Sequence, residues 1–226
     1  MTVVIVSFGG SNCDRDTKAA LDYLDIPARI VREGTSFPQS CSGIILPGGF
    51  SYGDYLRAGA IASRSSLIDQ LRSNVAEGTP LLGICNGAQI AAEAQLVPGA
   101  FTTNRDGRFR CEHIYLRVEN ATSPWTSAYN EGDVIEVPIA HGEGRYVIDR
   151  VELESLRSED RILFRYCDVD GQVSESVNPN GSTDNIAGVL GESHKVAVMM
   201  PHPERATLPY LGATDGQEIL RAFSLN

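Results

Sequence analysis

The stretch PLLGICNGAQIAAEAQ, from Pro80 to Gln95, decides the fold. A strand-like apolar run over 80–84 stops at a Gly-x-Cys-x-Gly turn, and a helix-like run follows at once. This is the pattern of a nucleophile elbow, with Cys85 in the position of the serine of the hydrolase motif. Gly83 and Gly87 leave room where side chains would crowd the turn, and the helix start favours a thiolate at Cys85. The alternative interpretation is a cysteine buried at the end of a core strand.

A candidate base for this nucleophile lies near the C-terminus, in VAVMMPHPER over 196–205. Prolines before and after His202 restrict the backbone toward extended geometry. Residues two apart in an extended segment point to the same side, so Glu204 is placed to accept a hydrogen bond from one ring nitrogen of His202. The other ring nitrogen then faces Cys85, as a catalytic triad requires. A rigid surface loop with a solvated histidine and glutamate is the alternative.

A third element precedes both, in SGIILPGGFSYGDY over 42–55. A short apolar strand ends there in Pro47, Gly48 and Gly49. Two glycines after a strand expose backbone N–H groups and let a substrate carbonyl approach closely. Acyl transfer needs such donors for the developing oxyanion, and we assign them to the N–H groups of Gly49 and Asn86. An ordinary strand-ending turn is the alternative.

Together these motifs resemble the class I, triad-type glutamine amidotransferases. The resemblance is closest to the glutaminase subunit, subunit I, of phosphoribosylformylglycinamidine synthase, and it runs from residue 3 to the C-terminus. Five segments carry it: VVIVSFGGSNCDRDT (3–17), GGFSYGDYLRAGAIA (48–62), GICNGAQ (83–89), HGEGRY (141–146) and MPHPER (200–205). The triad elements alone give only the class, whereas the segments 48–62 and 141–146 are specific to the purine-pathway member.

The resemblance implies a glutaminase that works through a Cys85, His202 and Glu204 triad and a γ-glutamyl thioester. It implies that Gln89 helps to hold the glutamine, beside Gly48, and that the segment with His141 and Gly142 contacts the glutamine, largely through backbone. On spacing alone Gln89 is equally a surface polar residue and His141 a structural histidine. His141 is also a rival base, since Glu143 lies two residues away, but flanking glycines hold that pair less rigidly than the prolines around His202.

The resemblance also implies the partners. Ammonia would pass through a tunnel to a synthetase subunit, which uses ATP and magnesium to convert formylglycinamide ribonucleotide to formylglycinamidine ribonucleotide. A small third subunit is expected as well. The chain has neither a P-loop nor a Rossmann glycine motif, so we expect no nucleotide, metal or other cofactor in this chain itself.

Bulk properties agree with this interpretation. A chain of 226 residues suits one α/β domain, and we take 1–226 as a single glutaminase domain. The net charge of −10 argues against a nucleic-acid partner. No apolar run approaches 18 residues, so neither a membrane span nor a membrane partner is expected. Five widely spaced cysteines without a C-x-x-C pair argue for reduced thiols in a cytoplasm and against zinc, and we treat Cys13, Cys41, Cys111 and Cys167 as incidental.

Alternating strands and helices predict an α/β fold: an open, mostly parallel, flavodoxin-like sheet flanked by helices, with an antiparallel addition on one edge. The site then lies at the carboxyl ends of parallel strands. Helices are predicted over 14–24, with Asp14 as N-cap, 65–76, from the elbow to about 94, and 215–223. Parallel strands are predicted over 3–8, 43–46, 80–84 and 196–200, and antiparallel ones over 113–119, 134–139, 162–169 and 186–190.

Two further functions remain open on the sequence. One is a stand-alone cysteine hydrolase of γ-glutamyl substrates, which glutaminase turnover with and without a synthetase would distinguish. The other is a regulatory subunit with an inactive glutaminase fold. The presence of all three triad residues and the oxyanion glycines disfavours it.

Overall fold

The computed structural model describes residues 1–38 and 40–224. Its main feature is a nine-stranded sheet in the order β2-β1-β3-β4-β11-β10-β9-β6-β7, and a small antiparallel pair, β5-β8, lies apart from it. Strands β2, β1, β3, β4 and β11 are parallel, and the other four join antiparallel beyond β11. The strands are β1 (Val3–Ser7), β2 (Ala28–Arg32), β3 (Gly43–Leu46), β4 (Leu81–Ile84), β5 (Ala100–Thr102), β6 (Arg110–Val118), β7 (Val134–His141), β8 (Arg145–Val147), β9 (Ile162–Cys167), β10 (Ile186–Leu190) and β11 (Val196–Met199).

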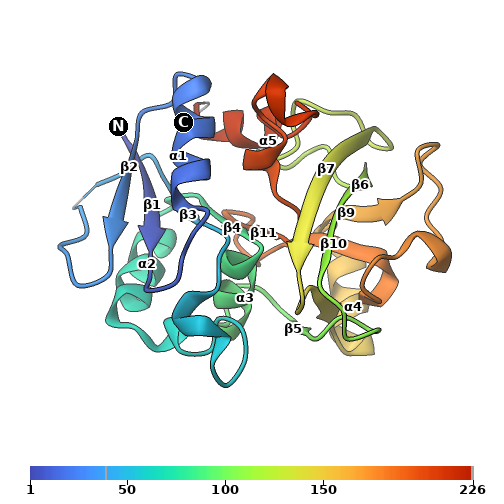
Figure 1. Ribbon diagram of the computed structural model, residues 1–226, viewed down its shortest axis with the longest axis horizontal. Helices are drawn as coiled ribbons and strands as arrows, with labels where there is room; N and C mark the ends of the chain where they lie inside the picture. The colour runs from blue at the N-terminus through green and yellow to red at the C-terminus, as the bar shows by residue number, and fades with distance from the viewer. Residues whose placement is uncertain (39, 225–226) are drawn as a thin grey trace.

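Helices cover both faces of the parallel half. In Figure 1, α1 and α5 lie above the parallel strands and α2 and α3 lie below them, while α4 accompanies the antiparallel half. The helices are α1 (Asp14–Tyr23), α2 (Ser66–Ala76), α3 (Asn86–Glu93), α4 (Arg150–Ser158) and α5 (Gln217–Arg221). No helix in the described ranges is both long and apolar enough to cross a membrane.

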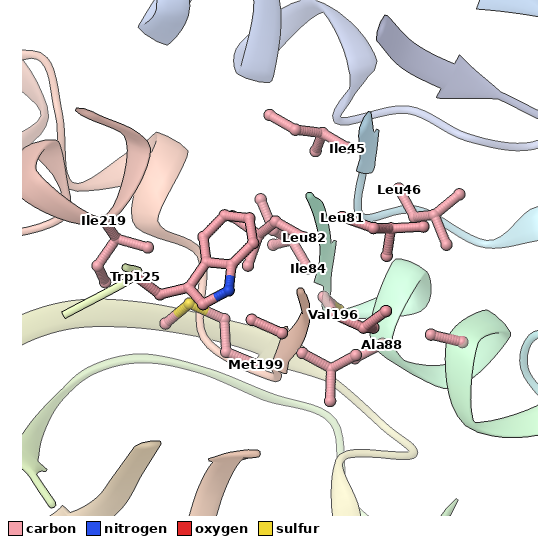
Figure 2. Close-up of a cluster of buried hydrophobic side chains, with 14 of the residues drawn as sticks. Ile45, Leu46, Leu81, Leu82, Ile84, Ala88, Trp125, Val196, Met199 and Ile219 are labelled. Carbon is pink, nitrogen blue, oxygen red and sulfur yellow. The ribbon is translucent and has the colours of Figure 1, made fainter. Parts of the chain in front are cut away.

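The core lies on both faces of the central strands β3, β4 and β11. Successive strand residues point to opposite faces, so Leu81 packs toward α3 while Leu82 packs toward Trp125 and Ile219 on the other side, as Figure 2 shows. All four residues of β4 are buried, which explains why it is a continuous apolar run without alternation. Two packed faces hold the carboxyl end of β4, and therefore Cys85, in a fixed position.

The predicted fold class is confirmed, including the antiparallel strands on one edge, and Gly49, Cys85 and His202 follow the carboxyl ends of the parallel strands β3, β4 and β11. The prediction missed β2, because its residues Ala28–Arg32 are mostly half-buried or exposed and include two arginines. It also missed β5, β8 and α4. The predicted N-cap of α1 was wrong: Cys13 is the N-cap and Asp14 is the first helical residue. The Asp14 carboxylate accepts hydrogen bonds from Ser7 Oγ on β1 and from the N–H of Arg15, both at 2.9 Å.

Candidate active site

Cys85 lies in the sharp turn between β4 and α3. Its backbone has φ = 50° and ψ = −107°, a conformation that non-glycine residues adopt only under strain. The turn needs both flanking glycines. A Cβ on Gly83 would lie 2.8 Å from the carbonyl oxygen of Gly87, and a Cβ on Gly87 would overlap the carbonyl oxygen of Leu46. The structure therefore has the geometry of a nucleophile elbow, and the cysteine is its outermost residue.

His202 and Glu204 follow β11, the strand next to β4. Both side chains are buried, and His202 Nδ1 lies 2.6 Å from Glu204 Oε1, as the sequence predicted. Burial alone would lower the pKa of His202, but the carboxylate of Glu204 and the sulfur of Cys85 together hold that pKa well above its usual value. The pair is thus built to keep an imidazolium in a buried site.

The sulfur of Cys85 and the ring of His202 are neighbours, and their interaction helps to raise the pKa of His202. Cys85 Sγ also donates a hydrogen bond to the carbonyl oxygen of Ala140 on β7 at 3.6 Å. His202 Nε2 is buried and has no hydrogen-bond partner in the described chain. Nε2 is therefore the ring nitrogen left to exchange a proton with Cys85, because Nδ1 is paired with Glu204.

The two proposed oxyanion donors lie at the ends of β3 and β4. Among the described residues, no backbone group accepts a hydrogen bond from the N–H of Gly49 or of Asn86. Gly49 has φ = 149°, and a Cβ there would lie 2.8 Å from the backbone of Ser11 and of Asn12. Only glycine fits this position, and both N–H groups are free for a substrate oxygen.

Gln89 connects α3 to the segment after β7. Its Nε2 donates to the carbonyl oxygen of Glu143 at 2.8 Å, and its Oε1 accepts from Asn86 Nδ2 at 3.0 Å. Gly142 lies in the same segment, and its carbonyl oxygen accepts from Asn104 N at 2.9 Å. The structure thus places Gln89 next to the segment with which the sequence analysis grouped it.

The ring of His141 is held by two asparagines. Nδ1 lies 3.1 Å from Asn104 Oδ1, and Nε2 lies 3.5 Å from Asn180 Nδ2. Burial, with the nearby charge of His202, lowers the pKa of His141 to about 4, so the ring is neutral. The ring also lies directly under Gly144, where a Cβ would overlap it. His141 supports its segment from inside. Sequence spacing gives no signal for Asn104 or Asn180, which lie far from it along the chain.

Cys13, which the sequence analysis treated as incidental, lies against the histidine and glutamate. Its sulfur and one ligand atom each of His202 and Glu204 lie within 4.8 Å of one another. Arg205 Nη2 donates to Cys13 Sγ at 3.1 Å and to Asp16 Oδ2 at 3.4 Å. These residues come together because α1 lies beside the segment after β11. No local sequence pattern predicts this contact.

A strained segment after β3 borders the other side of the site. Tyr52, Asp54 and Leu56 all have positive φ, between 53° and 72°. Burial and the charge of Glu143 raise the pKa of Asp54 to about 6. Asn86 Nδ2 donates to Asp54 Oδ1 at 3.5 Å, and Ser51 N donates to Asn86 Oδ1 at 3.2 Å, so this segment is bonded to the elbow at both atoms of one amide. The sequence analysis named none of these strained residues as site residues.

Comparison with known proteins agrees with this geometry. A family model described as a CobB/CobQ-like glutamine amidotransferase domain matches residues 1–217. The phosphoribosylformylglycinamidine synthase subunit PurQ of Natronomonas pharaonis is 62% identical over 223 residues, which cover 99% of this chain and 100% of that protein. The protein of the same name from Halobacterium salinarum is 60% identical over 224 residues, with coverage of 99% and 100%.

A solved structure gives the same result. The structure of PurLQS from Thermotoga maritima contains a chain that superposes with a TM-score of 0.87 at 40% identity, covering 99% of this chain and 97% of that one. The resemblance stated from the sequence and the predicted function class are thereby confirmed. The chain belongs to the CobB/CobQ-like glutamine amidotransferase family and, within it, to the PurQ proteins, the glutaminase subunits of phosphoribosylformylglycinamidine synthase.

Proposed function

We propose that Cys85, His202 and Glu204 are the catalytic residues of this glutaminase. The observation that carries the proposal is the buried pair His202 and Glu204, joined at 2.6 Å, beside a cysteine in a strained elbow. Removing two charged groups from water costs free energy that their attraction for each other need not offset. Their burial beside Cys85 therefore needs a functional reason. A triad base oriented by a carboxylate supplies that reason.

Catalysis begins when the thiolate of Cys85 attacks the side-chain carbonyl carbon of glutamine. The carbonyl oxygen becomes an oxyanion, which the N–H groups of Gly49 and Asn86 stabilise. The intermediate collapses as the C–N bond breaks, and His202 gives its proton to the leaving nitrogen, which departs as ammonia. A γ-glutamyl thioester remains on Cys85.

Hydrolysis of the thioester completes the cycle. His202, now neutral, accepts a proton from water as the water oxygen attacks the thioester carbon. The C–S bond breaks, glutamate leaves, and the thiolate of Cys85 and the imidazolium are restored. Glu204 orients the ring and stabilises its charged form in both half-reactions.

We infer that Gly48, Gln89, His141 and Gly142 form the glutamine-binding wall. Gln89 and Gly142 belong to one hydrogen-bonded unit with Glu143 and Asn104, which supports a preformed surface for the substrate. His141 contributes by holding this unit from beneath, since both its carbonyl oxygen and its ring are bonded to the side chain of Asn104.

The ammonia is delivered to a synthetase subunit. The solved relative from Thermotoga maritima is the PurLQS assembly, whose name supports a synthetase subunit and a small third subunit as partners of this chain too. We propose that this chain uses no cofactor in its own cycle, that ATP and magnesium act in the synthetase, and that the assembly works in the cytoplasm.

Reconstitution tests this proposal. The chain is mixed with a synthetase subunit and small subunit of the same family, and formation of the amidine is followed with glutamine or with ammonium as nitrogen source. Cys85→Ala should abolish the glutamine-dependent reaction and leave the ammonium-dependent one intact, because external ammonia bypasses Cys85. Cys111→Ser, at an exposed cysteine, is the matched control and should retain both activities. Glutamine-dependent synthesis by Cys85→Ala would refute the assignment.

A further inference from the structure

A second thiol, that of Cys13, lies next to His202 and Glu204, and the proposed reaction does not explain its position. Cys13 is buried at the start of α1, and the segment with His202 and Glu204 follows β11. Glu204 Oε2 is buried and has no hydrogen-bond partner in the described chain, whereas His202 Nε2, also unpaired, is the nitrogen that serves Cys85. Native proteins rarely leave a buried carboxylate oxygen unpaired, so Glu204 has unused capacity for a ligand.

The three side chains are the types that bind zinc. Thiolate, imidazole and carboxylate are its usual protein ligands, and three of them with one open position are a common set. Bond lengths of about 2.0 to 2.3 Å place tetrahedral ligand atoms about 3.3 to 3.8 Å apart. The ligand atoms of Cys13, His202 and Glu204 lie within 4.8 Å of one another, so shifts of about 1 Å would complete the set.

A cavity of about 390 Å³ borders this group on the side of Glu204. Glu204, Arg205 and Asp16 line it, whereas Cys13 and His202 lie behind them and do not. Arg205 donates to Cys13 Sγ, and a cation at the sulfur must displace it. Asp16 is half-exposed in the same cavity and already accepts from Arg205, so it offers the guanidinium another partner.

We propose that Cys13, His202 and Glu204 form an inhibitory site for a thiophilic divalent metal, with zinc as the ligand tested. On binding, the Cys13 thiol and the bonded nitrogen of His202 lose their protons to solvent, and the metal takes their place. A metal-bound imidazole no longer shuttles protons for Cys85. The binding step is independent of the proposed function, whereas the loss of glutaminase activity rests on the proposed role of His202.

The first test measures binding in a chain without the nucleophile. Cys85→Ala is titrated with Co²⁺, and the charge-transfer absorption of a cobalt–thiolate bond is recorded. We expect one Co²⁺ per chain with this band, competed away by Zn²⁺. The double variant Cys85→Ala/Cys13→Ser should lose the band. Cys85→Ala/Cys111→Ser is the matched control, since Cys111 lines the same cavity beside Glu112 and His113. It should keep the band, because Cys111 is not one of the proposed ligands. Loss of the band in Cys85→Ala/Cys111→Ser, or the absence of any band in Cys85→Ala, overturns the proposal.

A second measurement protects the test against a misfolded double variant. In Cys85→Ala, Zn²⁺ should slow alkylation of Cys13 at least about tenfold relative to Cys111, as read by mass spectrometry of the cysteine peptides. Equal alkylation rates of Cys13 with and without Zn²⁺ contradict the site. This readout needs no change at Cys13 itself.

Activity is tested in the assembled synthase. Zn²⁺ should inhibit glutamine-dependent synthesis and leave ammonium-dependent synthesis unchanged at the same concentration. In Cys13→Ser the concentration for half-inhibition should rise by about 10- to 100-fold, the usual effect of a weakened ligand set. If the wild-type chain and Cys13→Ser are inhibited equally, the metal does not act through this site.

Discussion

His202 and His141 differ in their neighbours, and the difference assigns them different roles. His202 is paired with a carboxylate, whereas His141 lies between two asparagine side chains. We predict that His202→Ala lowers kcat by a factor on the order of 10³ or more, as loss of a triad base does. His141→Ala should mainly raise KM, because the substrate segment loses its internal support. Steady-state kinetics of the assembled synthase distinguishes the two, and the reverse ranking would make His141 the base.

The low pKa of His141 has a consequence for stability. Its pKa is about 4 in the folded chain and about 6.5 in the unfolded chain, so the unfolded state binds more protons between these values. Its contribution to stability is therefore lost as the pH falls from 6.5 toward 4. His141→Gln removes this dependence, so the gap in unfolding free energy between wild type and variant should shrink by about 2 kcal/mol from pH 7 to pH 5. Urea titrations at the two pH values measure it, and a constant gap would refute the prediction.

Individual candidate site residues were predictable where the residues that define the pattern lie close together in the sequence. Cys85 is flanked by glycines, and His202 lies two residues from Glu204, so each pattern is complete within a few positions. Cys13, Asn104 and Asn180 reach the site only because the sheet brings distant segments together. The absence of a C-x-x-C pair argued against zinc, and the zinc site proposed above would use residues that the fold, rather than a local sequence pair, brings together.

At the scale of elements, the turn from β4 to α3 controls the site. Gly87 lies so close to β3 that a Cβ would overlap the carbonyl oxygen of Leu46. We predict that Gly87→Ala lowers the free energy of unfolding by about 3 kcal/mol and abolishes glutaminase activity, because α3 must move away from the sheet. Gly9→Ala is the control: its Cβ would meet only a ring carbon of Tyr52 at 3.8 Å, so stability should change little. Equal stability of the two variants, measured by urea unfolding, contradicts this.

The elements themselves were predicted best where burial is uniform. The runs of β3, β4 and β11 are buried at every residue and were found within about one residue of their observed bounds. The edge strand β2 and the helix α4 were missed, because their residues are mostly half-buried or exposed and tertiary contacts decide their conformation. The predicted location of the site, at the carboxyl ends of the central strands, did not depend on these peripheral elements.

At the scale of the whole molecule, a strained and exposed segment lies beside the candidate site, where a partner subunit could contact it. Cys85 Sγ donates to the carbonyl oxygen of Ala140, and the nearby segment with Tyr52, Asp54 and Leu56 is strained. Tyr55 and Leu56 on that segment are 75% and 92% exposed. Binding energy from a partner at this segment can move it and, through its bonds to Asn86, change the site.

We predict low glutaminase activity for the chain alone. Activity should rise at least about tenfold with the synthetase, its substrate and an ATP analogue bound, a coupling free energy of about 1.4 kcal/mol or more. The measurement is kcat/KM for glutamine in the free and assembled states. Equal values would favour a stand-alone hydrolase.

The central claim is that Cys85 carries the γ-glutamyl group during turnover. The direct measurement is rapid acid quenching of the assembled synthase during glutamine turnover, followed by mass spectrometry of its cysteine peptides. We predict a γ-glutamyl adduct on the peptide that contains Cys85, which does not form in Cys85→Ala, and no adduct on the peptide that contains Cys13. An adduct on Cys13, or glutamine turnover by Cys85→Ala, would contradict the claim.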